Sequence, residues 1–479
     1  MQKDHSVSGA SDRLEIAYTD KPVSGWGGLV LVVRFLDKLG LREMLRRALP
    51  DGRTSNNVIP ALDIVLSFFA TVLTGGNRFA HAERVRADEV VRGILGVPRL
   101  ASAMTLTRYF GGFVRGQVEH LSALLSEFAL ARLAPREPVT LDLDSTVFER
   151  YGKQEGSLKG HNPRKHGRPS HHPLLAMLSG VKVVLHAWLR SGNAGTSRGV
   201  CAFLAEALAL LPERVRLYAV RADSGFFTKE FLDELDGRGL AYAIAVRMTK
   251  PIQSLVVGAK EWRAFGPGLE AAALMYQAHG WKKPRRLVVV REEIRERPEA
   301  RGRKLIHVPG YTFHAVVTTL DDLVPEDAWR FYNGRADCEN RLKELKDDFG
   351  ASGFCLQSFD GTEAAFRLVC FLFNMVAEFK REVTRDDKPQ LDSLRARLLV
   401  VGAILGAAGR NRVLRLGLKG EFRDTFETLF ARIAALSFST VAQLDFSETE
   451  REVIAPSPWR ERRRRRASTG RSWPMADIN

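Results

Sequence analysis

The stretch from Tyr332 to Lys346, YNGRADCENRLKELK, most narrowly restricts what this chain can fold into. Within it, Tyr332, Arg335, Glu339 and Lys346 follow the spacing Y-x2-R-x3-E-x6-K. At roughly 100° per residue, these four side chains fall within about a 60° arc of a single helix. The pattern predicts a helix that presents a carboxylate beside two cations and a phenol. The alternative interpretation is a solvated helical face held by i,i+3 and i,i+4 ion pairs.

The apolar residues of this region predict how the helix is anchored. They fall together on the adjoining helical face: Phe331, Cys338, Leu342, Leu345 and Phe349. Such a stripe is suited to packing on a core. Pro325 is typical of a first helical turn and Gly350 of a helix end, whereas Gly334 is a weak point between them. We therefore expect one helix that starts near Pro325 and stops before Gly350.

A second acidic pattern lies between Val139 and Phe148, where Leu, Val and Phe alternate with β-branched and acidic residues. This pattern predicts a strand. Asp142 and Asp144 would share one face of the strand, because side chains repeat with a period of two. Carboxylates are disfavoured within strands, so two of them suggest a functional site. The alternative interpretation is an edge strand with a solvated face.

The region that follows alternates between apolar strand patterns and helical patterns. We expect strands at Leu174–Ser179, Val181–Trp188, Arg216–Arg221 and Leu240–Val246, and helices at Val200–Leu211 and Thr228–Leu235. Asp223 comes just after the fourth of the predicted strands. Functional sites gather where the strands of open α/β sheets end, so Asp223 is a candidate site residue. The alternative is an Asp with a structural role in the turn that precedes a helix.

Charge and composition restrict the classes of partner. Lys and Arg number 72 against 56 Asp and Glu, which gives a net charge of +16. This excess favours a polyanionic partner, with nucleic acid first and an anionic membrane surface second. No apolar run reaches the length of a bilayer span, and the N-terminus lacks the layout of a signal peptide. The four cysteines form no CxxC pair. We therefore expect a cytoplasmic protein without a zinc–cysteine site.

Several other segments carry basic or aromatic residues. The predicted loop at residues 151–173 is rich in Lys and Arg and suits contact with phosphates. Its histidines, His161, His166, His171 and His172, raise the alternative of a zinc site, but no regular ligand spacing supports one. Two tryptophans, Trp262 and Trp281, lie among cations, and a role in the core is the commoner fate of such residues. The run Arg462–Arg466 is typical of a solvated tail that adds non-specific affinity for DNA.

These patterns divide the chain into six parts. We expect a helical N-terminal region for DNA binding or dimerisation (1–135), the first part of an α/β domain (136–248), a β-rich insertion (249–321), the second part of that domain (322–385), a helical C-terminal region (386–458) and a basic tail (459–479). The C-terminal helices are predicted at Leu391–Leu405 and Phe422–Leu436. No helix-turn-helix pattern is clear in the N-terminal part, where a purely packing role remains open.

The order of these elements, with Asp144, Asp223 and Glu339 in that order along the chain, resembles the RNase H-like fold of DDE transposases. In particular, Y-x2-R-x3-E-x6-K is similar at all four positions to the YREK signature of a large superfamily of bacterial insertion-sequence transposases. Asp144-Ser145-Thr146 resembles the first catalytic Asp of that group, which small hydroxyl residues follow, and for this reason we prefer Asp144 to Asp142. Residues 152–156 and 162–173 resemble the insertion-sequence family numbered 1380.

The resemblance covers about residues 25–450 and implies a fold, a site and a partner. The implied fold is a mixed five-stranded sheet flanked by helices. The implied catalytic residues are Asp144, Asp223 and Glu339, and Tyr332, Arg335 and Lys346 would contact phosphates near the cleaved end. Three converging carboxylates hold two metal ions about 3.5–4 Å apart, and hard oxygen ligands suit Mg²⁺, with Mn²⁺ as a substitute. Trp262 or Trp281 would stack on a flipped base, as an insertion-domain Trp does in related enzymes.

The implied function is that of a DNA transposase which binds double-stranded DNA as a homodimer. It would recognise the terminal inverted repeats of an insertion sequence, cut the DNA ends and join the 3′-OH ends to target DNA. Two other functions remain open on the residues alone. One is an RNase H-like nuclease that recognises DNA structure and performs no strand transfer. The other is an inactive DNA-binding regulator.

Overall fold

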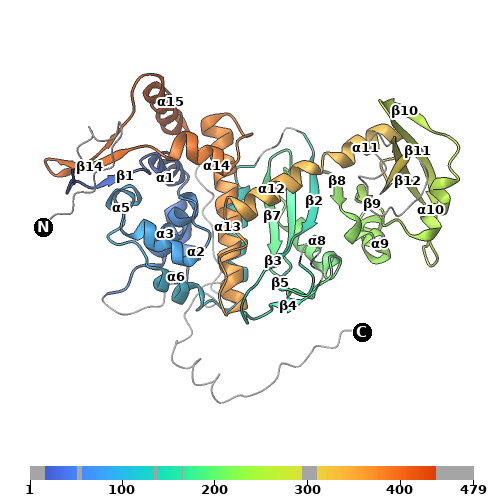
Figure 1. Cartoon of the computed structure of the whole chain (residues 1–479), viewed down its shortest axis with the longest axis horizontal. Helices are drawn as coiled ribbons and strands as arrows, with labels where there is room; N and C mark the ends of the chain where they lie inside the picture. The colour runs from blue at the N-terminus through green and yellow to red at the C-terminus, as the bar shows by residue number, and fades with distance from the viewer. Residues whose placement is uncertain are drawn as a thin grey trace, which may run out of the picture.

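A computed structural model describes residues 17–50, 57–133, 135, 137–160, 162, 165–293 and 310–437 of the chain. Three parts follow one another along the long axis of the molecule (Figure 1). A group of helices lies at one end, the central part of a large sheet lies in the middle, and the strands of the insertion lie at the other end. The predicted turn at Asp51-Gly52-Arg53, the segment Leu305–Val308 and the basic tail fall outside the described residues.

The large sheet has nine strands in the order β10-β11-β12-β13-β9-β8-β2-β6-β7. Its first half along the chain comprises β2 (Val139–Ser145), β6 (Leu174–Ser179), β7 (Val183–Trp188), β8 (Leu217–Ala222) and β9 (Tyr242–Ala245). Strand β2 pairs antiparallel with β6 and parallel with β8, and β8 pairs parallel with β9. The predicted strands of this region are therefore present, with bounds that agree to within three residues.

The insertion contributes the remaining strands: β10 (Arg263–Gly266), β11 (Leu269–Tyr276), β12 (Arg285–Glu293) and β13 (Tyr311–Thr318). They form an antiparallel run, and β13 pairs with β9 through Val317 and Ile244. The prediction of a five-stranded sheet was therefore wrong in size. The backbone groups of β9 would be unpaired at a sheet edge, and the insertion satisfies them by continuing the same sheet.

Helices cover both faces of the central strands. Leu141 and Leu143 of β2 point into a core shared with α8 (Val200–Ala209) and α9 (Lys229–Gly237). The opposite face, which includes Met177 of β6, packs against the helices that follow the insertion. Those helices are α11 (Pro325–Asn333), α12 (Ala336–Asp347) and α13 (Phe359–Phe379). Because residues alternate along a strand, Asp142 and Asp144 lie on the same face as Met177.

Helix α13 joins the sheet to the N-terminal helices. It is buried at every position from Gly361 to Phe379. Asn374 accepts a hydrogen bond from the backbone N–H of Val184 and donates one to its carbonyl, both at 2.8 Å. This side chain thereby satisfies backbone groups on the outer edge of the terminal strand β7.

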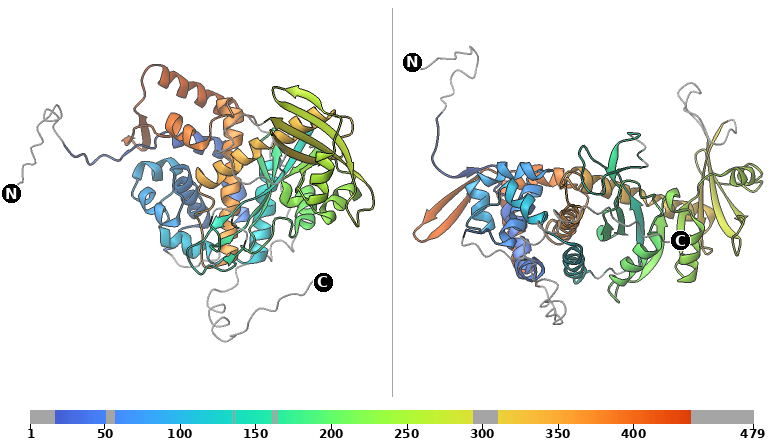
Figure 2. Two further views of the ribbon diagram at one scale, coloured as in Figure 1. Left: turned by 45° about the vertical axis from the view of Figure 1, so that its right-hand side comes forward. Right: turned by 90° about the horizontal axis from the view of Figure 1, so that it is seen from below.

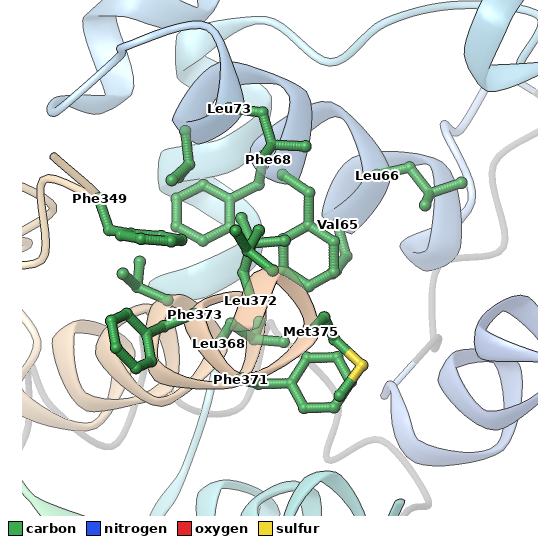
Figure 3. Packing of buried hydrophobic residues seen from close by; sticks show 14 of the residues in the cluster. Val65, Leu66, Phe68, Leu73, Phe349, Leu368, Phe371, Leu372, Phe373 and Met375 are labelled. Atoms are coloured by element: carbon green, nitrogen blue, oxygen red, sulfur yellow. The ribbon is translucent and has the colours of Figure 1, made fainter. Parts of the chain in front are cut away.

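The N-terminal region is mainly helical, as predicted. Its helices are α1 (Leu29–Lys38), α2 (Leu41–Ala48), α3 (Ala61–Leu73), α4 (Ala82–Arg86), α5 (Glu89–Leu95), α6 (Ala103–Phe110) and α7 (Arg115–Leu130). Figure 3 shows the contact between α3 and α13, where Val65 and Phe68 face Phe371 and Leu372. None of the helices in the described ranges is both long and apolar enough to cross a membrane.

The prediction of an all-helical C-terminal region was wrong. Helix α14 (Leu391–Leu394) continues as a π-helical turn to Leu399 and is followed by the strands β14 (Ala403–Ala408) and β15 (Asn411–Leu416). Glycines within and after β14 carry little helix propensity, and Gly409 adopts a φ of +61° in the turn between the strands. Strand β14 also pairs with β1 (Val23–Ser24), so the two ends of the described chain share one small sheet. Helix α15 (Glu421–Ala435) agrees with the prediction.

The predicted loop at residues 151–173 also contains more structure than expected. Short strands β3 (Phe148–Glu149), β5 (Pro169–His171) and β4 (Leu158–Lys159) form a small three-stranded sheet. His171 accepts a hydrogen bond at Nδ1 from Arg150 Nε at 2.9 Å, and His172 Nδ1 lies 2.7 Å from the carbonyl oxygen of Ala194. Both imidazoles are buried, and these contacts indicate that the two histidines have a structural role in the loop.

The aromatic contacts of α3 give a test of this core. The ring of Phe68 is fully buried, and its centroid lies 4.8 Å from that of Phe354 and 5.0 Å from that of Phe110. We expect Phe68→Ala to lower the free energy of unfolding by about 3–5 kcal/mol, because it removes these contacts and leaves a cavity. Phe422→Ala is the control, since Phe422 is 70% exposed. Chemical denaturation measures both, and equal effects would contradict this description of the core.

Candidate active site

Helix α12 is fixed against the sheet by the apolar stripe that the sequence predicted. Cys338, Leu342, Leu345 and Phe349 are all buried in the core on the β6 side. The sulfur of Cys338 lies 3.6 Å from that of Met177. Burial raises the pKa of the Cys338 thiol well above its ordinary value, which keeps it a neutral core residue. The polar stripe of α12 is thereby turned toward the end of β2.

The far half of α12 is held by a buried carboxylate. Glu344 lies 2.9 Å from Arg341 Nη1 and 3.2 Å from Lys380 Nζ, and it accepts a hydrogen bond from the backbone N–H of Leu391. The side chain of Glu344 is completely buried. These contacts link α12 to the end of α13 and to the start of α14. A buried charge with three partners tolerates little displacement, so the helix is restrained at this end.

The predicted single helix is interrupted at Gly334 and Arg335, so that part of the prediction was wrong. Arg221 of β8 explains the break, because its Nη1 donates a hydrogen bond of 2.6 Å to the carbonyl of Phe331. A Cβ atom at Gly334 would lie 2.6 Å from the same nitrogen. Gly334 therefore makes room for the guanidinium between α11 and the sheet. Gly334, which is a weak helix former, therefore lies where α11 and β8 approach each other closely.

Arg221 also determines the role of Asp142. Its Nε and Nη2 donate hydrogen bonds of 2.6 and 2.8 Å to the two carboxylate oxygens of Asp142. The side chain of Asp142 is 0% exposed. Both of its oxygens are thus occupied inside the protein, and this geometry is that of a structural ion pair. Sequence reasoning missed Arg221, although a charged residue within a buried strand is a signal of such a pair.

Asp144 lies two residues further along β2, at the end of the strand. Its Oδ2 lies 2.8 Å from Arg335 Nη2, and its Oδ1 accepts a hydrogen bond of 2.7 Å from the backbone N–H of Ser145. Burial raises the pKa of Asp144 to about 7. The guanidinium of Arg335 lowers this pKa, whereas Asp223 and Glu339 raise it further. The structure therefore brings these acidic side chains close enough to interact.

Arg335 stands between two of the three predicted carboxylates. Besides its contact with Asp144, it donates a hydrogen bond of 2.6 Å from Nη1 to Glu339 Oε1. The guanidinium is buried, whereas the Glu339 side chain is 61% exposed. Burial disfavours the charged form of Arg335, but Asp144 and the other nearby anions outweigh it and raise its pKa. The cation is thus held in place by the carboxylates around it.

Asp223 follows β8 directly, as predicted, at the same end of the sheet as Asp144. Its Oδ1 accepts a hydrogen bond of 2.8 Å from the backbone N–H of Gly225, which fixes the turn after the strand. The half-buried side chain contributes to the raised pKa of both Asp144 and Tyr332. Asp223 therefore stabilises the turn after β8 and also lies at the candidate site.

Of the other members of the signature, Tyr332 lies beside this cluster and Lys346 lies further along the same helix as Glu339. Tyr332 lies at the end of α11, and its ring stacks on Trp329 with centroids 5.9 Å apart. Burial raises the pKa of Tyr332, Arg335 lowers it, and Asp223, Glu339 and Asp144 raise it further. Lys346 is half-buried in the last turn of α12. Trp329 was not anticipated from the sequence, because an aromatic in the first turns of a helix is commonplace.

The two tryptophans singled out in the insertion are packed within the protein. Trp281 is buried beneath Arg285 and beside Phe227. Trp262 is partly buried and donates a hydrogen bond of 3.0 Å from its indole nitrogen to the carbonyl of Ala259, with Arg291 over its ring. The core role named above as the commoner fate therefore holds for Trp281, whereas stacking of the part-exposed Trp262 on a base stays a prediction. Cation–π and edge contacts account for the cations near these rings.

The carboxylates are not arranged as a ready metal site. Within the described ranges, no three His, Cys, Asp or Glu side chains form a group that would hold a metal ion. Arg335 supplies the reason, because its guanidinium bridges Asp144 and Glu339. The donor atoms themselves are hard carboxylate oxygens of the kind that Mg²⁺ and Mn²⁺ prefer. Glu339 is exposed, so its rotamer can change without unfolding the core.

The buried pair of Asp142 and Arg221 gives a first test of the site description. We expect Arg221→Met to lower the free energy of unfolding by about 3–5 kcal/mol, because it leaves the Asp142 carboxylate buried without its partner. Arg423→Met is the control, since the Arg423–Glu427 pair is exposed and such pairs contribute about 0–1 kcal/mol. Chemical denaturation compares the two variants. A loss of under about 1 kcal/mol in Arg221→Met would contradict the structural role.

The raised pKa of Asp144 predicts a pH-dependent effect on stability. The ordinary value is 3.8 and the folded value is about 7, so the folded state keeps a proton that the unfolded state releases between these values. The stability that this carboxyl contributes is therefore complete below its unfolded pKa and is lost as the pH rises through about 7. As the pH rises from 3.8 to about 7, we expect the free energy of unfolding of Asp144→Asn relative to that of the wild type to increase by on the order of 4 kcal/mol.

Denaturant unfolding at a series of pH values measures this difference. The exposed Asp347→Asn on α12 is the matched control, since it removes the same charge without changing a buried group. A difference between Asp144→Asn and wild type that does not vary from pH 4 to pH 8 would contradict the raised pKa of Asp144.

Comparisons with known proteins bear on the family of this chain. No curated protein matches it. A piggyBac transposase, solved as a synaptic complex with hairpin DNA, has a TM-score of 0.43 and 10% identity, covering 92% of this chain and 88% of that chain. A TM-score this low does not by itself establish a shared fold. The family described as "Transposase DDE domain group 1" matches residues 8–438, which is most of the sequence. The chain therefore belongs to this family of DDE transposases.

Proposed function

We propose that the protein is a cut-and-paste DNA transposase whose catalytic residues are Asp144, Asp223 and Glu339. It binds the terminal inverted repeats of an insertion sequence, cleaves the DNA ends and joins the 3′-OH ends to target DNA. The observation that carries the proposal is the electrostatic convergence of these three carboxylates, from β2, the end of β8 and α12, around Arg335. Membership of the DDE family supports it.

The arrangement of the strands supports an RNase H-like core. The five strands β7-β6-β2-β8-β9 form a mixed run within the larger sheet, with β2 in the middle. In this run β6 is antiparallel to both neighbours, and β8 is parallel to both. Asp144 lies at the end of β2 and Asp223 follows β8, which is its parallel neighbour, so the same sheet edge presents both carboxylates.

The donor set fits divalent cations. Asp144, Asp223 and Glu339 would hold two Mg²⁺ ions, or Mn²⁺ as a substitute, and when bound these ions activate the nucleophile and stabilise the leaving oxygen. Glu339 has the exposure needed to turn from Arg335 toward the other two carboxylates. The pKa of Asp144 near 7 means that this carboxyl is largely protonated in mildly acidic solution. Cation binding there is therefore expected to weaken as the pH falls.

Tyr332, Arg335 and Lys346 are the residues proposed to contact phosphates beside the cleaved bond. The Nε of Arg335 is buried and has no hydrogen-bond partner among the described residues. A phosphate oxygen would satisfy this donor, and a guanidinium is well suited to bind phosphates with two parallel hydrogen bonds. The phenol of Tyr332 stays neutral because burial raises its pKa, so it can donate a hydrogen bond to an anion.

The partner proposed for this site is double-stranded DNA, bound by a homodimer that holds two ends. The net charge of +16 supports a polyanionic partner. Exposed cations such as Lys153 and Lys159 in the segment before β5 supply part of the positive surface. In a bacterial cell such a protein would act on the nucleoid.

The decisive test uses a plasmid that carries the DNA flanking the gene. We expect purified protein with Mg²⁺ to produce 3′-OH ends at the element boundaries and joined products. We expect Glu339→Gln to lose cleavage by at least about 10³-fold, because it removes an essential carboxylate while leaving its shape. Glu427→Gln, which makes the same chemical change at an exposed position of α15, is the control and should remain active. Product mapping by primer extension measures both steps.

The outcomes separate the competing functions. Undiminished cleavage by Glu339→Gln would contradict the proposed catalytic site. Nicks without joined products would favour an RNase H-like nuclease that performs no strand transfer. Tight binding of the ends without any cleavage by the wild type would favour an inactive DNA-binding regulator.

A further inference from the structure

The β14–β15 hairpin projects from the molecule at the end opposite the insertion strands (Figures 1 and 2). Its strands are joined by a two-residue turn at Gly409 and Arg410, with Ala408 paired to Asn411. Among the described residues, the contacts that anchor the hairpin lie at its base. There β1 pairs with Ile404 and Ala403, and the side chain of Leu405 packs closely against Gly93 of α5. The outer half extends beyond these contacts.

The charge of this segment differs from that of the rest of the surface. Residues 393–420 contain six Lys or Arg and no Asp or Glu. The exposed cations of the hairpin and its exit are Arg410, Arg412, Arg415 and Lys419. None of these four has an ion-pair partner among the residues described. By contrast, several exposed arginines on the helices pair with nearby acids, for example Arg238 with Glu234 and Arg47 with Glu43.

The shape of the hairpin complements its charge. From Gly406 to Gly409, β14 carries no side chain larger than a methyl group, so one strand of the ribbon is thin. Arg412 pairs across the ribbon with Ala407, and Arg415 lies over Gly406. Arg412 and Arg415 are three residues apart on one strand, so they point to opposite faces. The ribbon therefore presents a cation on each face and Arg410 and Asn411 at its tip.

We propose that the β14–β15 hairpin is a DNA-binding arm that enters the major groove of duplex DNA. The major groove admits a two-stranded ribbon, and its two walls are lined with phosphates that cations on opposite faces would reach. Arg and Asn side chains at the tip suit the edges of guanine and adenine. This arm lies apart from the catalytic carboxylates, and it rests on the proposed function in that the protein must bind DNA.

DNA binding would also account for the low stability expected of the β14–β15 hairpin by itself. A two-stranded hairpin is at best marginally stable in water without packing on one face. Small residues in β14 gain little burial energy within the protein, but they let a groove approach the backbone closely. Duplex DNA would thus supply contacts that the other described residues do not make with the outer half.

The test compares DNA binding by the wild type and by Arg410→Gln/Arg412→Gln/Arg415→Gln. Binding is measured by fluorescence anisotropy in EDTA at several salt concentrations, with a duplex of the DNA flanking the gene and a scrambled duplex. We expect the triple variant to bind at least about tenfold more weakly near 0.1 M salt, and the slope of log K against log salt to fall by up to about 2.7. A larger loss on the flanking duplex would indicate base contacts at the tip.

The matched control is Arg46→Gln/Arg47→Gln/Arg86→Gln, which removes the same charge from exposed helical positions that pair with acids. Equal weakening in the control and the hairpin variant would mean a general charge effect and would overturn the proposal. Unchanged binding by a hairpin variant with wild-type thermal stability would overturn it as well. If the wild type binds neither duplex, both the proposed function and this inference fail. If the wild type binds DNA and the hairpin variant binds it equally well, only this inference fails.

Discussion

The docking of α12 on the face of β2 and β6 is the constraint on which the proposed site depends. The apolar stripe around Cys338 fixes the rotation of the helix, and the buried Glu344 fixes its far end against Lys380. With both held, Glu339 is directed toward the end of β2, where Asp144 lies. A rotation of one residue, roughly 100°, would turn the carboxylate away from the sheet. The residues that anchor the helix and the proposed catalytic carboxylate therefore lie on adjoining faces of one helix.

Arg335 gives the acidic cluster an internal counter-ion. Burial of Asp144 beside two other carboxylates is costly for the charged form, and the guanidinium offsets part of this cost. The same side chain carries a buried donor with no hydrogen-bond partner in the described part of the chain, which makes it suited to an incoming phosphate. We infer that the site without DNA is held together by this cation. Binding of phosphate and of divalent cations would then redistribute the same set of charges.

Residue patterns predicted much of the central sheet and the candidate site, because period-two and period-3.6 signals are local. They placed Asp144 on the first strand, Asp223 just after the fourth and Glu339 on a helix with one apolar face, and in the structure the first strand ends sooner, so that Asp144 lies at its end. They did not predict the bidentate pairing of Asp142 by Arg221, since 79 residues separate the two in the chain. The continuation of the sheet through the insertion also depends on tertiary pairing. The C-terminal hairpin was mistaken for a helix because its Leu and Val spacing suits both structures.

The central claim is that Asp144, Asp223 and Glu339 form one site for divalent cations when DNA is bound. Iron-mediated chain cleavage tests it most directly, because Fe²⁺ in place of Mg²⁺ generates hydroxyl radicals that cut only nearby backbone. With the flanking DNA bound, and with ascorbate and peroxide added, we predict cuts clustered around these three positions, suppressed by excess Mg²⁺. Mass spectrometry of the fragments locates the cuts. Cleavage confined to other parts of the chain, or cuts near only one of the three residues, would contradict the account.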